Sequence, residues 1–178
     1  MRKTVFGGGN SVDNFIARPD HGVDWLMWGD EVAAISAEFW TTIDTVIMGR
    51  KTYEVVVRSG QPDGYPGMKT YVFSRTLQPT SGGNVTIVSE DAAAFVRQLK
   101  QQEGKDICVM GGGELARSLF EAGLIDEIGL NIHPVLLGKG IPLFHQMTRQ
   151  IDLELKECRR FKNGCVYVRY RVKTEDVD

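Results

Sequence analysis

Short apolar runs alternate with amphipathic stretches along much of the chain. Four runs are compact, and each is bounded by Gly, Asp, Ser or Lys, which is typical of strands buried on both faces of a parallel sheet. These predicted strands cover residues 45–48, 70–73, 85–88 and 107–110. Between them, Val32, Ile35 and Phe39 share one helical face. The same spacing recurs over residues 92–99 and 115–120, so we expect helices that cover the sheet.

The last part of the chain changes to a period of two. Residues 166–172 alternate Val or Tyr with wetter positions, and residues 153–156 alternate Leu with charged side chains. The turn at residues 162–164, Lys-Asn-Gly, joins the two runs as a predicted antiparallel hairpin. We therefore expect one α/β domain over residues 1–173 with a mixed sheet, and a loose acidic tail at residues 174–178.

Composition and charge exclude several classes of protein. The chain has 178 residues, 42% of them hydrophobic, and a net charge of −2, which suits one ordinary globular domain. Its Lys and Arg form no basic stripe, so we expect no nucleic-acid partner. No apolar run approaches the ~20 residues of a membrane span, and the glycines at residues 7–9 interrupt any signal-peptide core. We expect a cytoplasmic protein that binds no membrane.

The cysteines and histidines give no sign of a metal site. Cys108, Cys158 and Cys165 are odd in number and lack CxxC spacing, so neither a disulfide framework nor a zinc site is indicated. His133 precedes a proline at a strand end, and neither it nor His145 has a second ligand at helical or strand spacing. Both are interpreted as structural, and we expect no metal.

The glycines after the run at 107–110 form the most informative segment. Gly111, Gly112 and Gly113 let a ligand approach the backbone, and the helix predicted to begin at Glu114 offers unpaired N–H groups that suit a pyrophosphate. A tight strand-to-helix turn explains the glycines equally well. With Ala116 the segment also fits the GxGxxA fingerprint, so a standard Rossmann domain is the alternative fold, although this match comes late in the chain.

Two further strand ends carry basic residues. Gly49, Arg50, Lys51 and Thr52 follow one predicted strand, and bases at the start of a helix oppose its dipole unless an anion is present. Ser74 and Arg75 follow the next strand. Because the carboxyl ends of parallel strands are where open α/β sheets bind ligands, these residues point to an anionic ligand. Taken singly, each is also consistent with a solvated surface charge.

Taken together, these segments resemble the dihydrofolate reductase family, and more closely the reductase domain of riboflavin biosynthesis with its small stand-alone relatives. The resemblance rests on the order and spacing of residues 10–17, 46–54, 109–115, 126–128 and 134–144. It implies a three-layer α-β-α sandwich with a mostly parallel sheet and an antiparallel C-terminal hairpin. It also implies a homodimeric NADPH-dependent reductase acting on a small heterocycle, such as an aminouracil ribosyl phosphate. Dihydrofolate reduction proper and noncatalytic NADPH binding are the alternatives.

The resemblance also assigns cofactor contacts. The 2′-phosphate of NADPH would bind to the bases and hydroxyl at two strand ends, and clustered bases favour NADP over NAD. The pyrophosphate would lie at the glycine turn, and a third stretch would border the nicotinamide. The residues implied for the 2′-phosphate are Arg50, Lys51, Ser74 and Arg75. Those for the pyrophosphate are Thr52, Gly111, Gly112, Gly113, Glu114 and Leu115, and those for the nicotinamide are Gly9, Ile16 and Ala17. Gly49 is implied as a further cofactor-binding residue.

The proton donor is the least determined part. Folate reductases use a carboxylate five residues after a Trp, a spacing that Trp25 and Asp30 reproduce, and either Asp30 or Glu31 begins the predicted helix. Asp30 is also an ordinary N-cap residue. Asp13 and His21 are further candidates, although both suit exposed turns.

Overall fold

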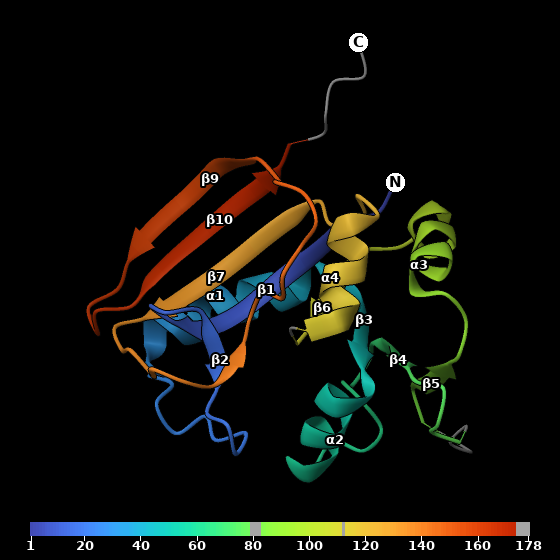
Figure 1. The fold of residues 1–178 in the computed structure, drawn as a ribbon, viewed down its shortest axis with the longest axis horizontal. Coiled ribbons are helices and arrows are strands. Elements are labelled where there is room, and N and C mark those ends of the chain that lie inside the picture. Colours follow the sequence, from blue (N-terminus) through green and yellow to red (C-terminus); the bar gives the residue numbers. More distant parts are fainter. Residues whose placement is uncertain (79–82, 112, 174–178) are drawn as a thin grey trace.

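The four strands predicted from the apolar runs are neighbours in one half of a single sheet in the computed structural model, which describes residues 1–78, 83–111 and 113–173. Within these ranges the sheet has eight strands in the order β5-β4-β3-β6-β1-β7-β10-β9 (Figure 1). Their bounds are β1 (Thr4–Ser11), β3 (Ile43–Gly49), β4 (Lys69–Phe73), β5 (Val85–Val88), β6 (Asp106–Met110), β7 (Glu127–His133), β9 (Leu153–Arg160) and β10 (Val166–Val172). A small second sheet pairs β2 (Phe15–Ala17) with β8 (Ile141–Pro142).

The predicted fold class is confirmed. The six strands from β5 to β7 run parallel, whereas β10 is antiparallel to both β7 and β9. The alternative of a standard Rossmann domain is wrong, because the glycine turn follows β6, inside the sheet, and an antiparallel hairpin closes one edge. Strand β1 was not among the strands predicted from apolar runs, because glycines occupy residues 7–9 in its middle.

Helices cover both faces of the sheet. Along the described chain they are α1 (Asp30–Thr41), α2 (Arg50–Arg58), α3 (Ala92–Gln101) and α4 (Gly113–Glu121). Helix α4 lies in front of the sheet in Figure 1 and α1 lies behind it. None of these helices is long and apolar enough to cross a membrane.

Each face of the sheet has its own core. Val96 and Leu99 of α3 and Leu119 of α4 pack against Phe6 and Val109 on one face. On the other face, a second cluster joins α2 and the end of α1 to strands β3 and β4. Its buried members include Tyr53, Val56, Val46, Met48 and Val72, and Phe39 and Trp40 of α1 pack against them. The arrangement is therefore the expected three-layer sandwich.

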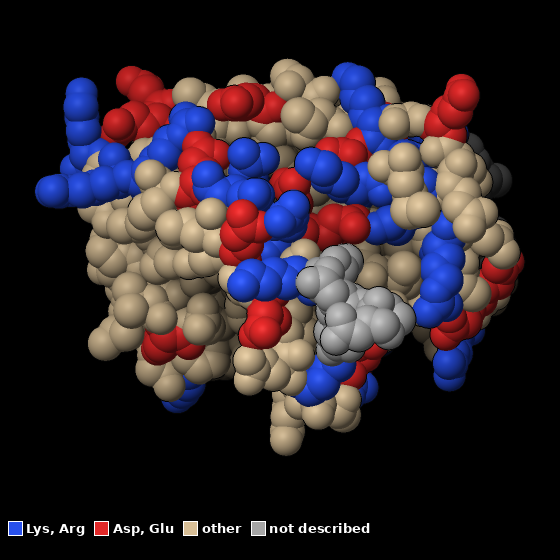
Figure 2. Space-filling model, turned by 90° about the horizontal axis from the view of Figure 1, so that it is seen from above, with Lys and Arg blue, Asp and Glu red and all other residues tan. Residues whose placement is uncertain are grey.

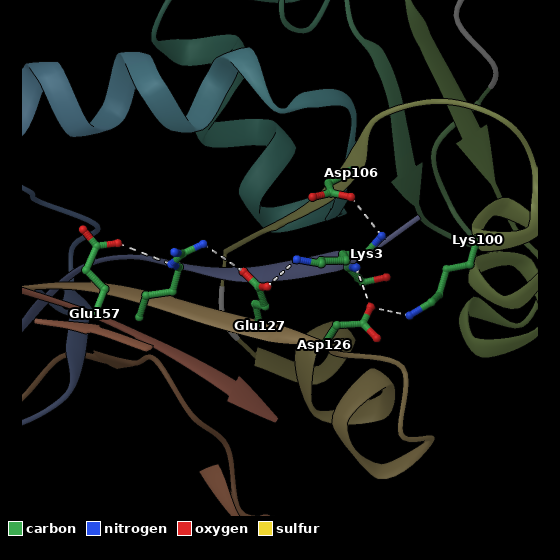
Figure 3. A network of polar contacts seen from close by, with 8 residues as sticks. Lys3, Lys100, Asp106, Asp126, Glu127 and Glu157 are labelled. Carbon is green, nitrogen blue, oxygen red and sulfur yellow. Dashed lines mark hydrogen bonds and ion pairs between the residues drawn. The ribbon is translucent and has the colours of Figure 1, made fainter. Parts of the chain in front are cut away.

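The amino ends of the central strands are tied together by charged side chains. Seen from this side, positive and negative side chains are interleaved over the surface (Figure 2). The backbone N–H of Lys3 donates to Asp106 at 3.0 Å, and the Lys3 ammonium donates to Glu127 at 2.7 Å (Figure 3). Arg169 and Glu157 continue the chain of ion pairs onto β10 and β9. The network thus links the starts of β1, β6 and β7 to the antiparallel hairpin.

One ion pair in this network contains a buried ammonium group. Asp126 accepts a hydrogen bond from the backbone N–H of Thr4 at 2.6 Å and forms an ion pair with Lys100 of α3. The side chain of Lys100 is 7% exposed. A buried ammonium requires such a partner, so Asp126 fixes α3 against the edge of the sheet.

Candidate functional site

The predicted phosphate-binding residues lie at the carboxyl ends of adjacent strands. Gly49 and Phe73 are register partners in β3 and β4, so Arg50 and Ser74 follow neighbouring strand ends. Ser74 accepts hydrogen bonds through its hydroxyl from the backbone N–H groups of Thr76 at 3.2 Å and Leu77 at 3.0 Å. These bonds fix the turn that carries the next residue, Arg75.

The basic side chains at these strand ends differ in their partners. Arg50 donates to Glu54 at 2.7 Å, one helical turn along α2. Lys51 and Arg75 are exposed and form no ion pair within the described ranges. A Cβ added at Gly49, the N-cap of α2, would meet no atom within 4 Å. The corner therefore offers open backbone and two uncompensated positive charges, which suit a phosphate group.

The glycine turn after β6 brings two helix N-termini together. Gly111 has a φ of +79° and Gly113 a φ of +82°, values that favour glycine. A Cβ at Gly111 would lie 2.2 Å from the Oγ1 atom of Thr52, so the start of α2 touches the turn that leads into α4. Both helices direct their positive dipole ends to this edge of the sheet. Gly112 lies outside the described residues.

The two residues that follow this turn have clear structural roles. Glu114 is bound by His145 at 3.2 Å and by Arg117 at 2.8 Å, and these hydrogen bonds, that of His145 first, lower the pKa of its carboxyl group. Its negative charge is thus compensated next to the predicted anion site. The side chain of Leu115 packs against the core. Only the backbone groups of these two residues remain for a ligand.

The sheet opens between β1 and β6. Strand β1 pairs with β6 only from Thr4 to Phe6, yet it continues to Ser11 beside β7. Gly8 lies in the part of β1 that pairs with β7 but not with β6. It is exposed, and a Cβ there would meet nothing within 4 Å. An open, side-chain-free stretch inside a sheet gives room for a flat ring against the backbone.

The neighbouring glycine is covered on the opposite face. A Cβ at Gly9 would lie 2.9 Å from Leu26 and 3.2 Å from the Nε2 atom of His133. Successive residues of a strand point to opposite faces, so β1 is packed at Gly9 on one face and open at Gly8 on the other. Of the other residues implied to border the nicotinamide, Ala17 is buried and Ile16 packs against the core.

The carboxylates proposed as proton donors differ in their surroundings. Helix α1 begins at Asp30 with Gly29 as its N-cap, so the interpretation of Asp30 as a cap is wrong. Asp30 is exposed and its side chain forms no hydrogen bond with a described residue. Glu31 accepts a hydrogen bond from the backbone N–H of Lys162 at 2.8 Å, so it holds the turn between β9 and β10.

The two other candidate proton donors lie in loops. Asp13 accepts hydrogen bonds from the Ser11 hydroxyl at 2.6 Å and from the backbone N–H groups of Leu137 and Gly138 at 3.1 and 2.8 Å. These bonds, the Ser11 bond first, lower the pKa of Asp13. Its carboxylate therefore ties the end of β1 to the loop after β7. His21 is exposed in a turn, with a φ of +68°.

The sequence indicated that His133 is structural but not that it lies beside the glycine strand. His133 is 2% exposed, accepts a hydrogen bond from the backbone N–H of Met27 at 3.0 Å, and meets the edge of the Trp25 ring at a centroid distance of 5.5 Å. Its position at the carboxyl end of a strand was the available signal. Its partners are distant in sequence, so no local pattern indicated them.

Comparison with known proteins gives concordant matches. The RibD C-terminal domain family matches residues 8–167. The uncharacterized protein YwjB of Bacillus subtilis (strain 168) is 38% identical over 164 residues, which cover 90% of this chain and 92% of YwjB.

Solved structures share the fold. A candidate riboflavin biosynthesis protein from Shewanella sp. PV-4 superposes with a TM-score of 0.85 at 21% identity, over 97% of this chain and 99% of that one. A diaminohydroxyphosphoribosylaminopyrimidine deaminase/5-amino-6-(5-phosphoribosylamino)uracil reductase from Thermotoga maritima superposes with a TM-score of 0.72 at 14% identity. That match covers 97% of this chain and 57% of the Thermotoga protein.

Proposed function

We propose that this chain, which belongs to the RibD C-terminal domain family, is an NADPH-dependent reductase that transfers a hydride to a small heterocyclic substrate. The observation that carries the proposal is the meeting of two helix N-termini, through Thr52 and Gly111, beside the opening between β1 and β6. Phosphate groups suit the first feature and a flat ring suits the second. The Thermotoga structure, whose protein includes an aminouracil reductase, supports a heterocyclic substrate.

The residues of this chain fit such a cofactor. Lys51 and Arg75, exposed and without an ion pair in the described ranges, would hold the 2′-phosphate, with Arg50 and Ser74 beside them. The backbone at the starts of α2 and α4 would hold the pyrophosphate. Gly8 would border the nicotinamide, as its open position in the strand allows. NADPH supplies the hydride when bound.

The acceptor must also gain a proton, because hydride transfer leaves negative charge on it. We assign this role to Asp30, whose carboxylate forms no hydrogen bond with the described residues, rather than to Glu31, which holds the hairpin turn. A homodimer remains part of the proposal, and sedimentation of the purified protein tests it separately.

Cofactor preference tests the proposal directly. Binding of NADPH and of NADH is measured by calorimetry, and oxidation of NADPH is then followed with pyrimidine, pteridine and flavin compounds. Arg75→Ala should weaken NADPH binding by about 1 to 3 kcal/mol, or about 5- to 150-fold, while leaving NADH binding nearly unchanged.

The matched control is Arg97→Ala, which removes an exposed arginine from α3, away from the strand ends. It should leave the binding of both nucleotides unchanged. Equal losses for NADPH and NADH in Arg75→Ala would remove the 2′-phosphate role. Absence of any binding by the unmodified protein would refute the function.

A further inference from the structure

His133 joins three parts of the chain that are distant in sequence. It is the last residue of β7 and the register partner of Ser11 in β1. Its Nδ1 atom accepts the backbone N–H of Met27, from the segment before α1, at 3.0 Å. The Sγ atom of Cys165, just before β10, lies 3.4 Å from the same nitrogen, and Asn131 lies 3.1 Å from Nε2. The ring thus connects the central sheet, the hairpin and the segment before α1.

These contacts define the protonation state of the ring. A backbone N–H can only donate, so Nδ1 carries no proton, and a neutral imidazole then carries its proton on Nε2. The group that faces Nε2–H must accept. The atom placed 3.1 Å from Nε2 is the Nδ2 atom of Asn131, which can only donate, and exchanging the oxygen and nitrogen of this amide puts Oδ1 there as the acceptor. Without this exchange, Oδ1 is buried without a partner. Both polar groups are satisfied only by the neutral, Nε2-protonated ring.

Protonation would break the contact with Met27, because an imidazolium ion has two donors and no acceptor. Among the described residues, no neighbour of the ring stabilises the positive charge. Trp25, Leu26 and Met27 carry no charge, Gly9 faces Nε2 from β1, and the titratable side chain in contact within the described part of the chain is the Cys165 thiol. Burial raises the pKa of that thiol and lowers the pKa of His133. Within the described ranges no carboxylate forms an ion pair with the ring.

The contact with Met27 places the adjacent residue on the glycine strand. Leu26 is the side chain that lies 2.9 Å from the Cβ position of Gly9, and Asp30 begins α1 four positions later. We infer that His133 is a positioning residue: as a neutral ring it holds residues 25–27 against the face of β1 on which Gly9 lies, and protonation releases them. Only the link between this contact and turnover rests on the proposed function.

Nuclear magnetic resonance of the ¹⁵N-labelled full chain tests the inference without any substrate. Ring nitrogen shifts should show the Nε2-protonated neutral form at about pH 7, and a titration midpoint below the ordinary value of 6.5. The protection factor of the Met27 amide, corrected for intrinsic exchange, should fall at least about tenfold as the ring is protonated.

Two asparagine substitutions provide the comparison. His133→Asn keeps an acceptor near the Nδ1 position but does not titrate, so the Met27 amide should stay protected at every pH. His21→Asn alters an exposed histidine at a φ of +68°, which asparagine tolerates, and should behave like the unmodified protein.

The pH dependence of NADPH turnover then tests whether this contact affects activity. Turnover of NADPH should decline with the protonation of His133 in the unmodified protein and in His21→Asn, and this decline should be absent in His133→Asn. An Nδ1-protonated ring at neutral pH overturns the inference even if the enzyme is active. So does a protection factor of the Met27 amide that does not change as His133 titrates. Lack of reductase activity with the expected resonance results would instead refute the proposed function alone.

Discussion

Gly111→Ala tests the junction on which the cofactor site depends. Gly111 has a φ of +79°, and a Cβ there would lie 2.2 Å from Thr52 Oγ1, 3.0 Å from its Cγ2 and 3.1 Å from its Cβ. The substitution therefore introduces two penalties, a strained backbone and a collision between the turn after β6 and the first turn of α2.

A matched glycine separates the two penalties. Gly67 has a φ of +74°, and a Cβ there would meet nothing within 4 Å. Gly67→Ala should cost only the backbone strain, about 1 kcal/mol, and lower the Tm by about 3 °C. Gly111→Ala adds overpacking of about 2 kcal/mol, for a total of about 3 kcal/mol and a Tm lower by about 9 °C.

A double-mutant cycle identifies Thr52 as the colliding partner. Thr52→Ala removes the two nearest atoms and leaves the Cβ at 3.1 Å. The combined variant should therefore be more stable than the sum of the single effects by about 1 kcal/mol or more, measured by urea unfolding. If Gly111→Ala costs no more than Gly67→Ala, or if the two effects add, the close approach of the two helix starts is refuted.

Three further variants probe other parts of the molecule. Asp126→Asn leaves the buried ammonium of Lys100 without its carboxylate and should lower the free energy of unfolding by about 2 kcal/mol, since Asp126 itself is 38% exposed; urea unfolding measures this. A thiol reagent should modify only exposed Cys158 in the native chain, because Cys108 and Cys165 are buried and burial raises both pKa values, that of Cys108 to about 12; mass spectrometry locates the label. Asp30→Asn should lower turnover at least about 100-fold without changing NADPH affinity, as steady-state kinetics and calorimetry reveal.

The parts of the fold that follow from local patterns could be predicted from the sequence. The run at 85–88 coincides with β5, and the Lys-Asn-Gly turn at 162–164 joins β9 to β10, because buried strands and tight turns have strong residue preferences. The strand-end rule likewise located Arg50 and Ser74 beside each other, since parallel register partners end together. These features depend on local residue patterns and on the general geometry of parallel sheets.

The role of His133 could not be predicted in this way. Its contacts come from Met27, Asn131 and Cys165, and only the folded sheet brings these residues to one place. Glu31 gives the opposite example, since its place at the start of a helix suggested chemistry, whereas its carboxylate binds the hairpin turn. Helical position alone did not distinguish Glu31 from Asp30.

The glycines of β1 explain why the most distinctive strand of the site escaped prediction from the apolar pattern. A Cβ at Gly7 would lie 1.8 Å from the carbonyl oxygen of Gly129 in β7, so this position must be bare for two strands to pair closely. Gly9 is bare because Leu26 and His133 pack onto it. Of the three glycines, only Gly8 faces open space. Gly7 and Gly9 are thus required by packing, and Gly8 leaves room for a ligand. A run of glycines that resembles a turn in the sequence is therefore a strand, and side chains from neighbouring segments, such as Leu26 and His133, fill part of the space beside it.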